Sequence, residues 1–305
     1  MTSLLVSELL RFRSRRLLVV MLGGALLGTG IGVVIAAWQS TPPTSEVRTA
    51  AQARADEEFR LCMDSDFGDG EFPGTREEFC RENSGNLAHY MPSHLALVGL
   101  PEILEGVSSI TSILGLVIGA SFVAASWQTG TISTIFTWEP RRLRWFAARI
   151  LVLAAGVFVV TALIVAFLSA GLGLAAVLRG STTGVDGAWW TDALTTSLRV
   201  SAAAAVSAVI GGAVAAIGRH TAAALGVVFV WTAVLEGLVR GLRPLWTPWL
   251  LGDNLVAFLS WRTAGYGFPD GSFVLSPGRA IFVILCYTAV VLAIGLIFVR
   301  IRDVQ

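Results

Sequence analysis

The stretch WQTGTISTIFTWEPRRLRWFAAR, residues 127–149, separates two long apolar runs and decides how the chain must fold. The runs at 106–126 and 150–177 contain no charged residue, and each is long enough to cross a bilayer as a helix. The polar stretch between them must therefore lie at a membrane face. Because Pro140 denies a helix its continuation, the pattern predicts a short surface helix over 129–138.

The charge of this stretch predicts its side of the membrane. One acid, Glu139, is outnumbered by four arginines, Arg141, Arg142, Arg144 and Arg149. Short connections with such an excess of arginine stay on the cytoplasmic side. We therefore expect this turn to face the cytoplasm.

The composition predicts an all-α polytopic membrane protein. Of the 305 residues, 54% are hydrophobic and 14% are charged, and the mean hydropathy is +0.71. All 22 basic side chains are arginine, which excludes a phosphate-binding loop of the GxxxxGK(S/T) type, so any ATP-driven work must use another chain and we expect no enzyme here. A net charge of +1, with no basic patch on a water-soluble segment, gives no indication of nucleic-acid binding.

Six spans account for the apolar runs, and both termini are expected in the cytoplasm. The predicted spans are 17–37, 106–126, 150–177, 194–217, 221–238 and 279–299. All ten prolines fall outside these runs, so we expect regular helices. Glycines spaced by four residues, at 24, 28 and 32 and at 115 and 119, would let other helices approach closely. Cys286 lies in the sixth span and is expected to be buried and inert.

Residues 1–16 predict an interfacial helix on the cytoplasmic surface. Its apolar face would carry Leu4, Leu5, Leu9 and Phe12. Another face would carry Glu8, Arg11 and Arg15 at helical spacing. The alternative, the charged start of a signal peptide, is disfavoured because the apolar run that follows is too long and lacks a convincing cleavage site.

Residues 38–105 predict a small extracytoplasmic domain, because thirteen acids against five arginines give it a net charge of −8. A helix is expected over 46–61, and a capping box at Thr75 and Glu78 predicts a second one. Cys62 and Cys80 would then form a disulfide that joins the two helices, with two free thiols as the alternative.

Metal binding is not indicated in this domain. The acidic residues 64–70 invite a calcium interpretation, but their order departs from the EF-hand pattern, and a solvated acidic turn fits better. His89 and His94 lack a third ligand at a recognisable spacing.

Farther along the chain, residues 240–278 predict an outer hairpin of re-entrant or surface helices, because 245–261 is too apolar for a loop and too interrupted to span.

The sequence ASWQTGTISTIFTWEPRR, residues 125–142, resembles a stretch common in the permease subunits of bacterial type-2 ATP-binding-cassette exporters. The layout is similar too, with a surface helix before the first span, a polar turn between spans two and three and an apolar outer hairpin before span six. Gln128 and Ser126 stand near the place where that family usually has an acid.

The resemblance implies a location and a set of partners. It implies that two permease chains, identical or different, pack side by side in the bacterial cytoplasmic membrane. Each would rest on a separate ATPase subunit that holds ATP and Mg²⁺, while this chain binds no cofactor. The turn at 127–149 would be the coupling helix, with contacts from Thr129, Gly130, Thr131, Thr134, Glu139 and Arg141. The alternative is that these residues only anchor the turn at the lipid head groups.

The resemblance also implies a translocation path between the two chains, lined by spans two and five. The candidate residues are Ser108, Thr111, Ser112, Val227, Val230, Trp231 and Val234, for each of which lipid contact or packing within the chain is the alternative. Apolar spans suit a hydrophobic or amphipathic cargo such as a drug, lipid or peptide.

Two other functional classes remain as alternatives. An ion-coupled secondary transporter would require broken helices and ionisable residues at mid-membrane, which the sequence does not indicate. A membrane sensor or immunity protein would act through the acidic outer domain.

Overall fold

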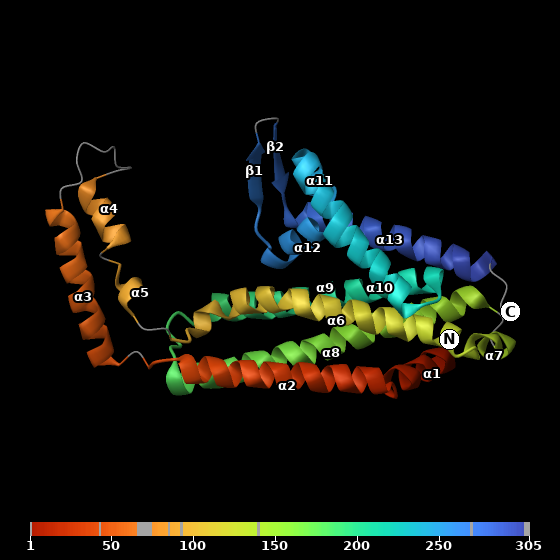
Figure 1. The fold of residues 1–305 in the computed structure, drawn as a ribbon. Coiled ribbons are helices and arrows are strands. Elements are labelled where there is room, and N and C mark those ends of the chain that lie inside the picture. The colour runs from red at the N-terminus through yellow and green to blue at the C-terminus, as the bar shows by residue number, and fades with distance from the viewer. Residues whose placement is uncertain are drawn as a thin grey trace. The chain divides into compact units, whose positions relative to one another are not determined.

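The protein is a polytopic membrane protein whose described residues are mainly helical, with one small β-hairpin among them (Figure 1). The computed structural model describes residues 2–42, 44–65, 75–84, 86–91, 94–138, 141–268 and 271–301. The described chain forms two compact units. Unit 1 comprises Met1–Leu27, Pro101–Phe167 and Trp190–Gln305, and unit 2 comprises Gly28–Leu100 and Leu168–Trp189.

Six helical segments in the described chain are long and apolar enough to cross a membrane. They are Arg16–Gln39, Leu97–Gln128, Arg142–Arg179, Gly187–Gly218, Thr221–Leu242 and Pro277–Ile301. In order, they correspond to α2 (Arg16–Gln39), η1 with α6 (Leu97–Gly99, Leu100–Gln128), α8 (Arg142–Arg179), α9 (Gly187–Gly218), α10 to α11 (Thr221–Phe229 to Glu236–Leu242) and α13 (Pro277–Ile301). Most extend beyond the predicted spans, because helical hydrogen bonding continues past the apolar residues that define the hydrocarbon core.

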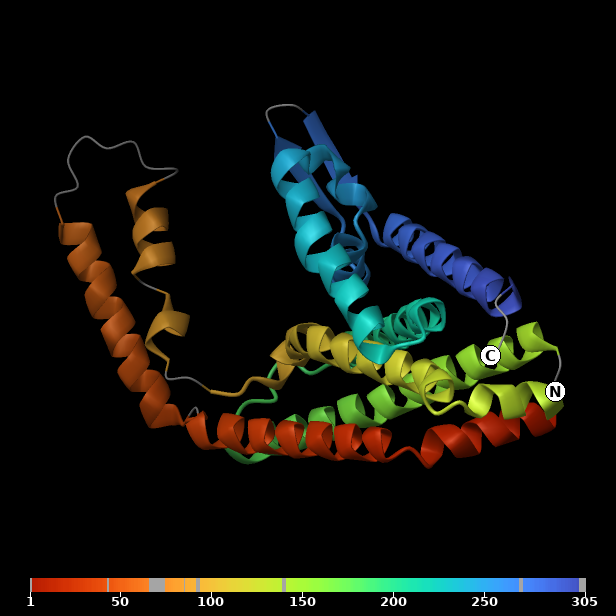
Figure 2. The same ribbon diagram turned by 45° about the vertical axis from the view of Figure 1, so that its right-hand side comes forward.

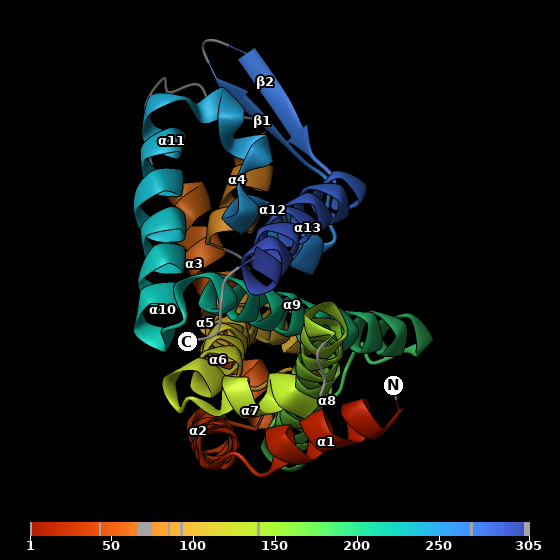
Figure 3. The same ribbon diagram turned by 90° about the vertical axis from the view of Figure 1, so that its right-hand side faces the viewer.

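Helix α9 is the central helix of unit 1, and it is built largely of small residues. Figure 3 shows α9 between α6 and α8 on one side and α10 and α13 on the other. The spaced glycines of α6 make close contact possible: a Cβ on Gly115 or Gly119 would lie within 3.0 Å of the carbonyl oxygen of Ala204 or Ala208. The two helices therefore touch backbone to backbone, as their small residues predict.

The fifth span departs from the regular helix that the sequence predicts. Residues Val230–Leu235 form a π-helical segment, η2, between α10 and α11, and the N–H of Glu236 donates to the carbonyl of Trp231. A π turn holds one extra residue, which rotates the following side chains by about 100° about the helix axis. No proline or other breaker marks the place in the sequence.

Between spans five and six the chain forms short helices and a hairpin. These are η3 (Pro244–Trp249), α12 (Leu251–Ser260), β1 (Ala264–Phe268) and β2 (Gly271–Leu275). The helices were expected and the strands were not. The strands pair antiparallel, with Ala264 opposite Leu275 and Tyr266 stacked on Phe273, ring centroids 5.1 Å apart. Their sequence signal is the alternation AGYGF and GSFVL around a Pro-Asp-Gly turn sequence.

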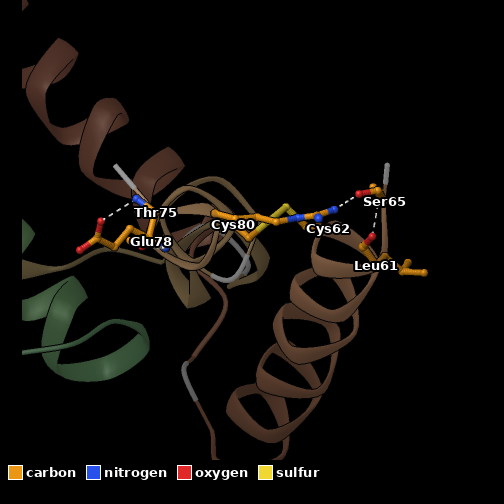
Figure 4. The surroundings of a disulfide bond; sticks show 7 residues. Leu61, Cys62, Ser65, Thr75, Glu78 and Cys80 are labelled. Carbon is orange, nitrogen blue, oxygen red and sulfur yellow. Dashed lines mark hydrogen bonds between the residues drawn. A yellow bond between two sulfur atoms is a disulfide. The ribbon is translucent and has the colours of Figure 1, made fainter. Parts of the chain in front are cut away.

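Unit 2 contains the disulfide that the sequence predicts. Cys62 at the end of α3 (Ser45–Asp64) is bonded to Cys80 in α4 (Arg76–Asn83), with the Cα atoms 5.7 Å apart (Figure 4). The capping box is also confirmed: Glu78 N–H donates to Thr75 Oγ1 at 3.2 Å, and Thr75 N–H donates to Glu78 Oε2 at 3.0 Å. The hydrogen bond from the Thr75 backbone N–H, and after it one from the Thr75 side chain, lower the pKa of the exposed Glu78 carboxyl. Of the predicted acidic turn, 64–70, residues 66–70 lie outside the described residues.

A second group of hydrogen bonds closes unit 2 around Ser40. Its hydroxyl donates to the carbonyl of Arg179 at 2.7 Å and accepts from the N–H of Leu95 at 2.9 Å. The N–H of Ser181 donates to the Leu95 carbonyl at 2.8 Å. One buried serine thus joins the ends of α2 and α8 to the segment before α6, while α5 (Leu87–Tyr90) lies between α4 and that segment. No group of three potential metal ligands occurs in the part of the chain that the structure describes.

Cys286 is exposed on the outer surface of α13, so the expectation that it is buried is wrong. Only one face of α13 packs on unit 1, and Val283 and Ile284 occupy that face while Cys286 points away from it. The apolar sequence predicted the span correctly, but it could not distinguish a lipid-facing position from a protein-facing one.

The thiols yield a direct test of unit 2. A membrane-permeant maleimide should label one cysteine, Cys286, in the unreduced protein, and all three cysteines after unfolding and reduction. The label count follows from the mass of the intact protein. In a Cys286→Ser variant the unreduced protein should take no label, and labelling at Cys62 or Cys80 before reduction would contradict the disulfide.

Candidate functional site

The turn between α6 and α8 carries a short helix, α7 (Thr131–Trp138), that packs firmly on its neighbours. Gly130 precedes it with φ of 67°, a conformation that favours glycine, and this lets the chain reverse directly after α6. Ile132 is buried, and the ring of Phe136 meets that of Trp145 edge to face at 5.3 Å. The apolar face of α7 is thereby fixed to α8, and its hydroxyl face is exposed.

The predicted coupling residues lie together on this turn. Thr129, Gly130, Thr131, Thr134 and Arg141 are all exposed, and Glu139 lies outside the described residues. Within unit 1, α1 (Thr2–Arg13), α7 and the end of α13 lie at the same end (Figures 1 and 2). The Arg142 guanidinium donates to the carbonyl of Arg300 at 3.4 Å, which ties the start of α8 to the end of α13.

Helix α1 is turned differently from the interfacial helix that the sequence predicts. Glu8, expected on a water-facing surface, is 1% exposed, and Phe12, expected in lipid, packs under Gly156 of α8. The large hydrophobic side chains that α1 exposes are Val6, Leu9 and Leu10. Glu8 faces the protein because it pairs there with a buried cation. The apolar residues on the other side of α1 therefore face outward.

That cation is Arg149, 3% exposed, whose Nη1 lies 3.3 Å from Glu8 Oε2. The other Glu8 oxygen lies 2.8 Å from Nη1 of Arg11. Arg149 also donates to the backbone carbonyl of Phe122 and lies over the rings of Phe122 and Trp145, 4.5 and 5.1 Å from their centroids. The phenyl rings of Phe12 and Phe122 meet at 5.4 Å. One buried ion pair therefore joins α1, α6 and α8, and sequence analysis missed it.

The predicted path residues fall into two environments. Ser108 and Thr111 are buried inside unit 1, and their hydroxyls donate to carbonyls of their own helix, those of Glu105 and Ser108, while Ser112 is half-buried. The residues of span five, Val227, Val230, Trp231 and Val234, are exposed. The two sets do not share one surface in a single chain.

An apolar cavity of ≈ 250 Å³ adjoins the π-helical segment. Val228, Trp231 and Leu251 line it, together with Tyr287 of α13. The rings of Trp231 and Tyr287 meet edge to face at 6.0 Å, and the Tyr287 hydroxyl donates to the carbonyl of Trp249 at 3.1 Å. The cavity therefore lies between span five, span six and α12, with no charged group among its lining residues.

Glu236, directly after the π segment, holds the start of α12. Its carboxylate accepts hydrogen bonds from the backbone N–H groups of Leu251 at 2.9 Å and Gly252 at 3.1 Å. Arg240 pairs with Glu236 at 3.1 Å and with Asp253 at 2.8 Å. A carboxylate at the first amides of a helix satisfies donors that have no partner within the helix. Sequence analysis assigned Glu236 no role.

No family model, no curated protein and no solved structure matches this chain. Its function must therefore be argued from the geometry of these sites.

The buried ion pair can be tested with single and double substitutions. Arg149→Met leaves the Glu8 carboxylate buried with one partner fewer, and we expect it to cost about 3–5 kcal/mol of stability. The double variant Glu8→Met with Arg149→Met removes both charges and should recover most of that loss. Thermal unfolding in detergent, followed by tryptophan fluorescence, measures the difference. A double variant that is no more stable than Arg149→Met would contradict a paired role.

Glu236→Gln should loosen α12 from span five. The amide nitrogen that replaces Oε2 cannot accept, so Gly252 N–H keeps only its longer bond of 3.4 Å to Oε1 and Arg240 loses a charged partner, at a cost of about 1–3 kcal/mol. Hydrogen exchange of residues 251–260 should become faster. The matched control is Glu102→Gln, since Glu102 is 61% exposed and 3.8 Å from Arg262. Equal exchange in both variants would show that Glu236 does not hold the helix.

Proposed function

We propose that this chain is the permease subunit of an ATP-driven exporter that moves a hydrophobic or amphipathic molecule out of the cytoplasm. The observation that carries the proposal is the form of α7. It is a short helix whose inner face is fixed by Ile132 and Phe136 and whose outer face presents exposed threonines. Such a surface is suited to bind a partner and to transmit the partner's conformational change to the spans.

Helix α8 is suited to transmit that change. It begins at Arg142, close after α7, and continues without interruption for 38 residues. The ion pair of Glu8 and Arg149 holds α1 to its first turns, so α1, α7 and α8 would move together. A partner that closes on ATP can shift a conformational equilibrium only through contacts that differ between two states, and a rigid lever provides such contacts.

The proposal includes an orientation and a set of partners. The arginines around α1 and α7 would face the cytoplasm of a bacterium, and the acidic, disulfide-bonded part of unit 2 would face the oxidising exterior. Two ATPase subunits holding ATP and Mg²⁺ and a second permease chain would complete the transporter. The exposed surface of Val227, Val230, Trp231 and Val234, beside the apolar cavity, would face the cargo or the second chain.

An ion-coupled secondary transporter is supported less well. Of the acids that the structure describes, Glu8 and Glu236 are the buried ones. Glu8 is paired with two arginines, and Glu236 is held by two backbone N–H groups and Arg240. Acids engaged in this way are structural, whereas a proton carrier must exchange its proton during transport.

The test is capture of an ATPase through α7. The full chain, purified with a tag from its native membrane, should bring with it a protein that contains a GxxxxGK(S/T) loop and hydrolyses ATP. Thr134→Arg places a long cation on the exposed face of α7 and should reduce that capture about tenfold, equivalent to about 1.4 kcal/mol.

The matched control for this experiment is Thr263→Arg, which changes an exposed threonine in the segment before β1. It should leave capture unchanged. Mass spectrometry identifies the captured protein, and the amount of each variant in the membrane must be equal. Absence of an ATPase from the wild-type preparation, or equal capture by both variants, would reject the proposed coupling.

A further inference from the structure

A pocket of ≈ 280 Å³ lies beside the buried ion pair, where α1, α6 and α8 meet the start of α7. Three guanidinium groups line it, those of Arg11, Arg15 and Arg149. Hydroxyl side chains line it as well, including Ser126 and Thr131. All of these residues belong to unit 1.

The charges around this pocket are not balanced. Glu8 is paired with Arg11 and with Arg149, so one carboxylate serves two guanidinium groups. Arg15 pairs with no carboxylate among the described residues; its Nη1 donates to the hydroxyl of Ser121 at 3.3 Å. Burial lowers the pKa of Arg15. The three guanidinium groups of the lining share one neighbouring carboxylate, that of Glu8, which leaves two positive charges in excess in a partly dehydrated place where an anion is favoured.

The lining also contains buried polar atoms that bond to nothing. Ser126 is 4% exposed, and its Oγ has no hydrogen-bond partner. The Nε of Arg149 is likewise buried and without a partner. Buried polar groups are normally hydrogen-bonded, so the Ser126 hydroxyl and the Arg149 Nε–H beside one pocket are free to bond to a ligand.

The start of α7 favours an anion in the same place. Thr131 is the first residue of that helix, and its hydroxyl lies 3.0 Å from that of Thr129, both in the lining of the pocket. The first N–H groups of a helix have no partner within it and carry the positive end of its dipole. Gly130, between the two threonines, adds no side chain that would block an approaching group.

We propose that this pocket binds the phosphate group of an anionic ligand, carried either by a phospholipid head group or by a free phosphate ion. Guanidinium groups pair with phosphate through two parallel hydrogen bonds, and hydroxyls supply further donors. Val6, Leu9 and Leu10 expose an apolar surface on α1, the same helix that provides Arg11, so acyl chains of a lipid would find apolar contact there. The inference holds whether or not the chain is a permease subunit.

Native mass spectrometry of the full chain in neutral detergent tests the proposal. The protein is mixed with equal amounts of phosphatidylglycerol and phosphatidylcholine, and the retained lipid is counted. Wild-type protein should retain the anionic lipid preferentially. Arg15→Gln removes a charge-assisted donor and should reduce that retention about tenfold. Arg13→Gln, an exposed arginine outside the lining, is the matched control and should leave it unchanged.

A second arm distinguishes the two sources of phosphate. Inorganic phosphate is added to lipid-free protein, and its effect on the thermal unfolding midpoint is measured. Stabilisation that is lost in Arg15→Gln but kept in Arg13→Gln would identify a free phosphate as a ligand. Preferential lipid retention without that stabilisation would identify the head group. Both outcomes support the proposed pocket.

Two outcomes would overturn it. The first is that neither the anionic lipid nor inorganic phosphate binds. The second is that Arg15→Gln and Arg13→Gln behave equally, because binding would then depend on the overall surface charge and not on the pocket. Ser126→Ala guards against misfolding as a cause. It removes a hydroxyl that has no partner in the free protein, so stability should be unchanged while retention falls about threefold, the loss expected for one hydrogen bond.

Discussion

The buried pair of Glu8 and Arg149 is the interaction on which the arrangement of unit 1 depends. Each ion alone would cost several kcal/mol to remove from water, so neither position is tolerable without the other. Their contact determines which face of α1 meets the protein, and it brings Phe12 onto Phe122 and Gly156. The helix before the first span is thus part of the folded bundle, and whatever acts on α8 also acts on it.

Features with a local signal could be predicted from the sequence. The six spans follow from uninterrupted apolar runs, because a helix pairs the backbone N–H and C=O groups of such a run within the bilayer. The capping box follows from the three-residue spacing of Thr75 and Glu78, and it sets the start of α4 so that Cys80 meets Cys62. The exposed turn around α7 follows from its arginines and Pro140. In each case neighbours in sequence determine the outcome.

Features that depend on distant residues could not be predicted. The sequence shows that Glu8 lies on a charged face, but not that this face meets Arg149, 141 positions away. The hydrogen bond from Leu251 N–H to Glu236 depends on how the end of span five meets α12, 15 positions farther along the chain. The proposed phosphate pocket is formed by residues in or next to four segments, α1, α6, α7 and α8. The Ser126 hydroxyl without a hydrogen-bond partner supports it, and no sequence pattern could have indicated that.

The glycine contact between α6 and α9 constrains how this protein can move. Gly115 and Gly119 leave no layer of side chains between the two backbones, so there is nothing at that seam to slide or repack. We therefore expect α6 and α9 to move as one rigid body. Span five differs, since its π-helical turn at Trp231 departs from the regular α-helical hydrogen bonds, and a change of helical register would disturb the bundle least there.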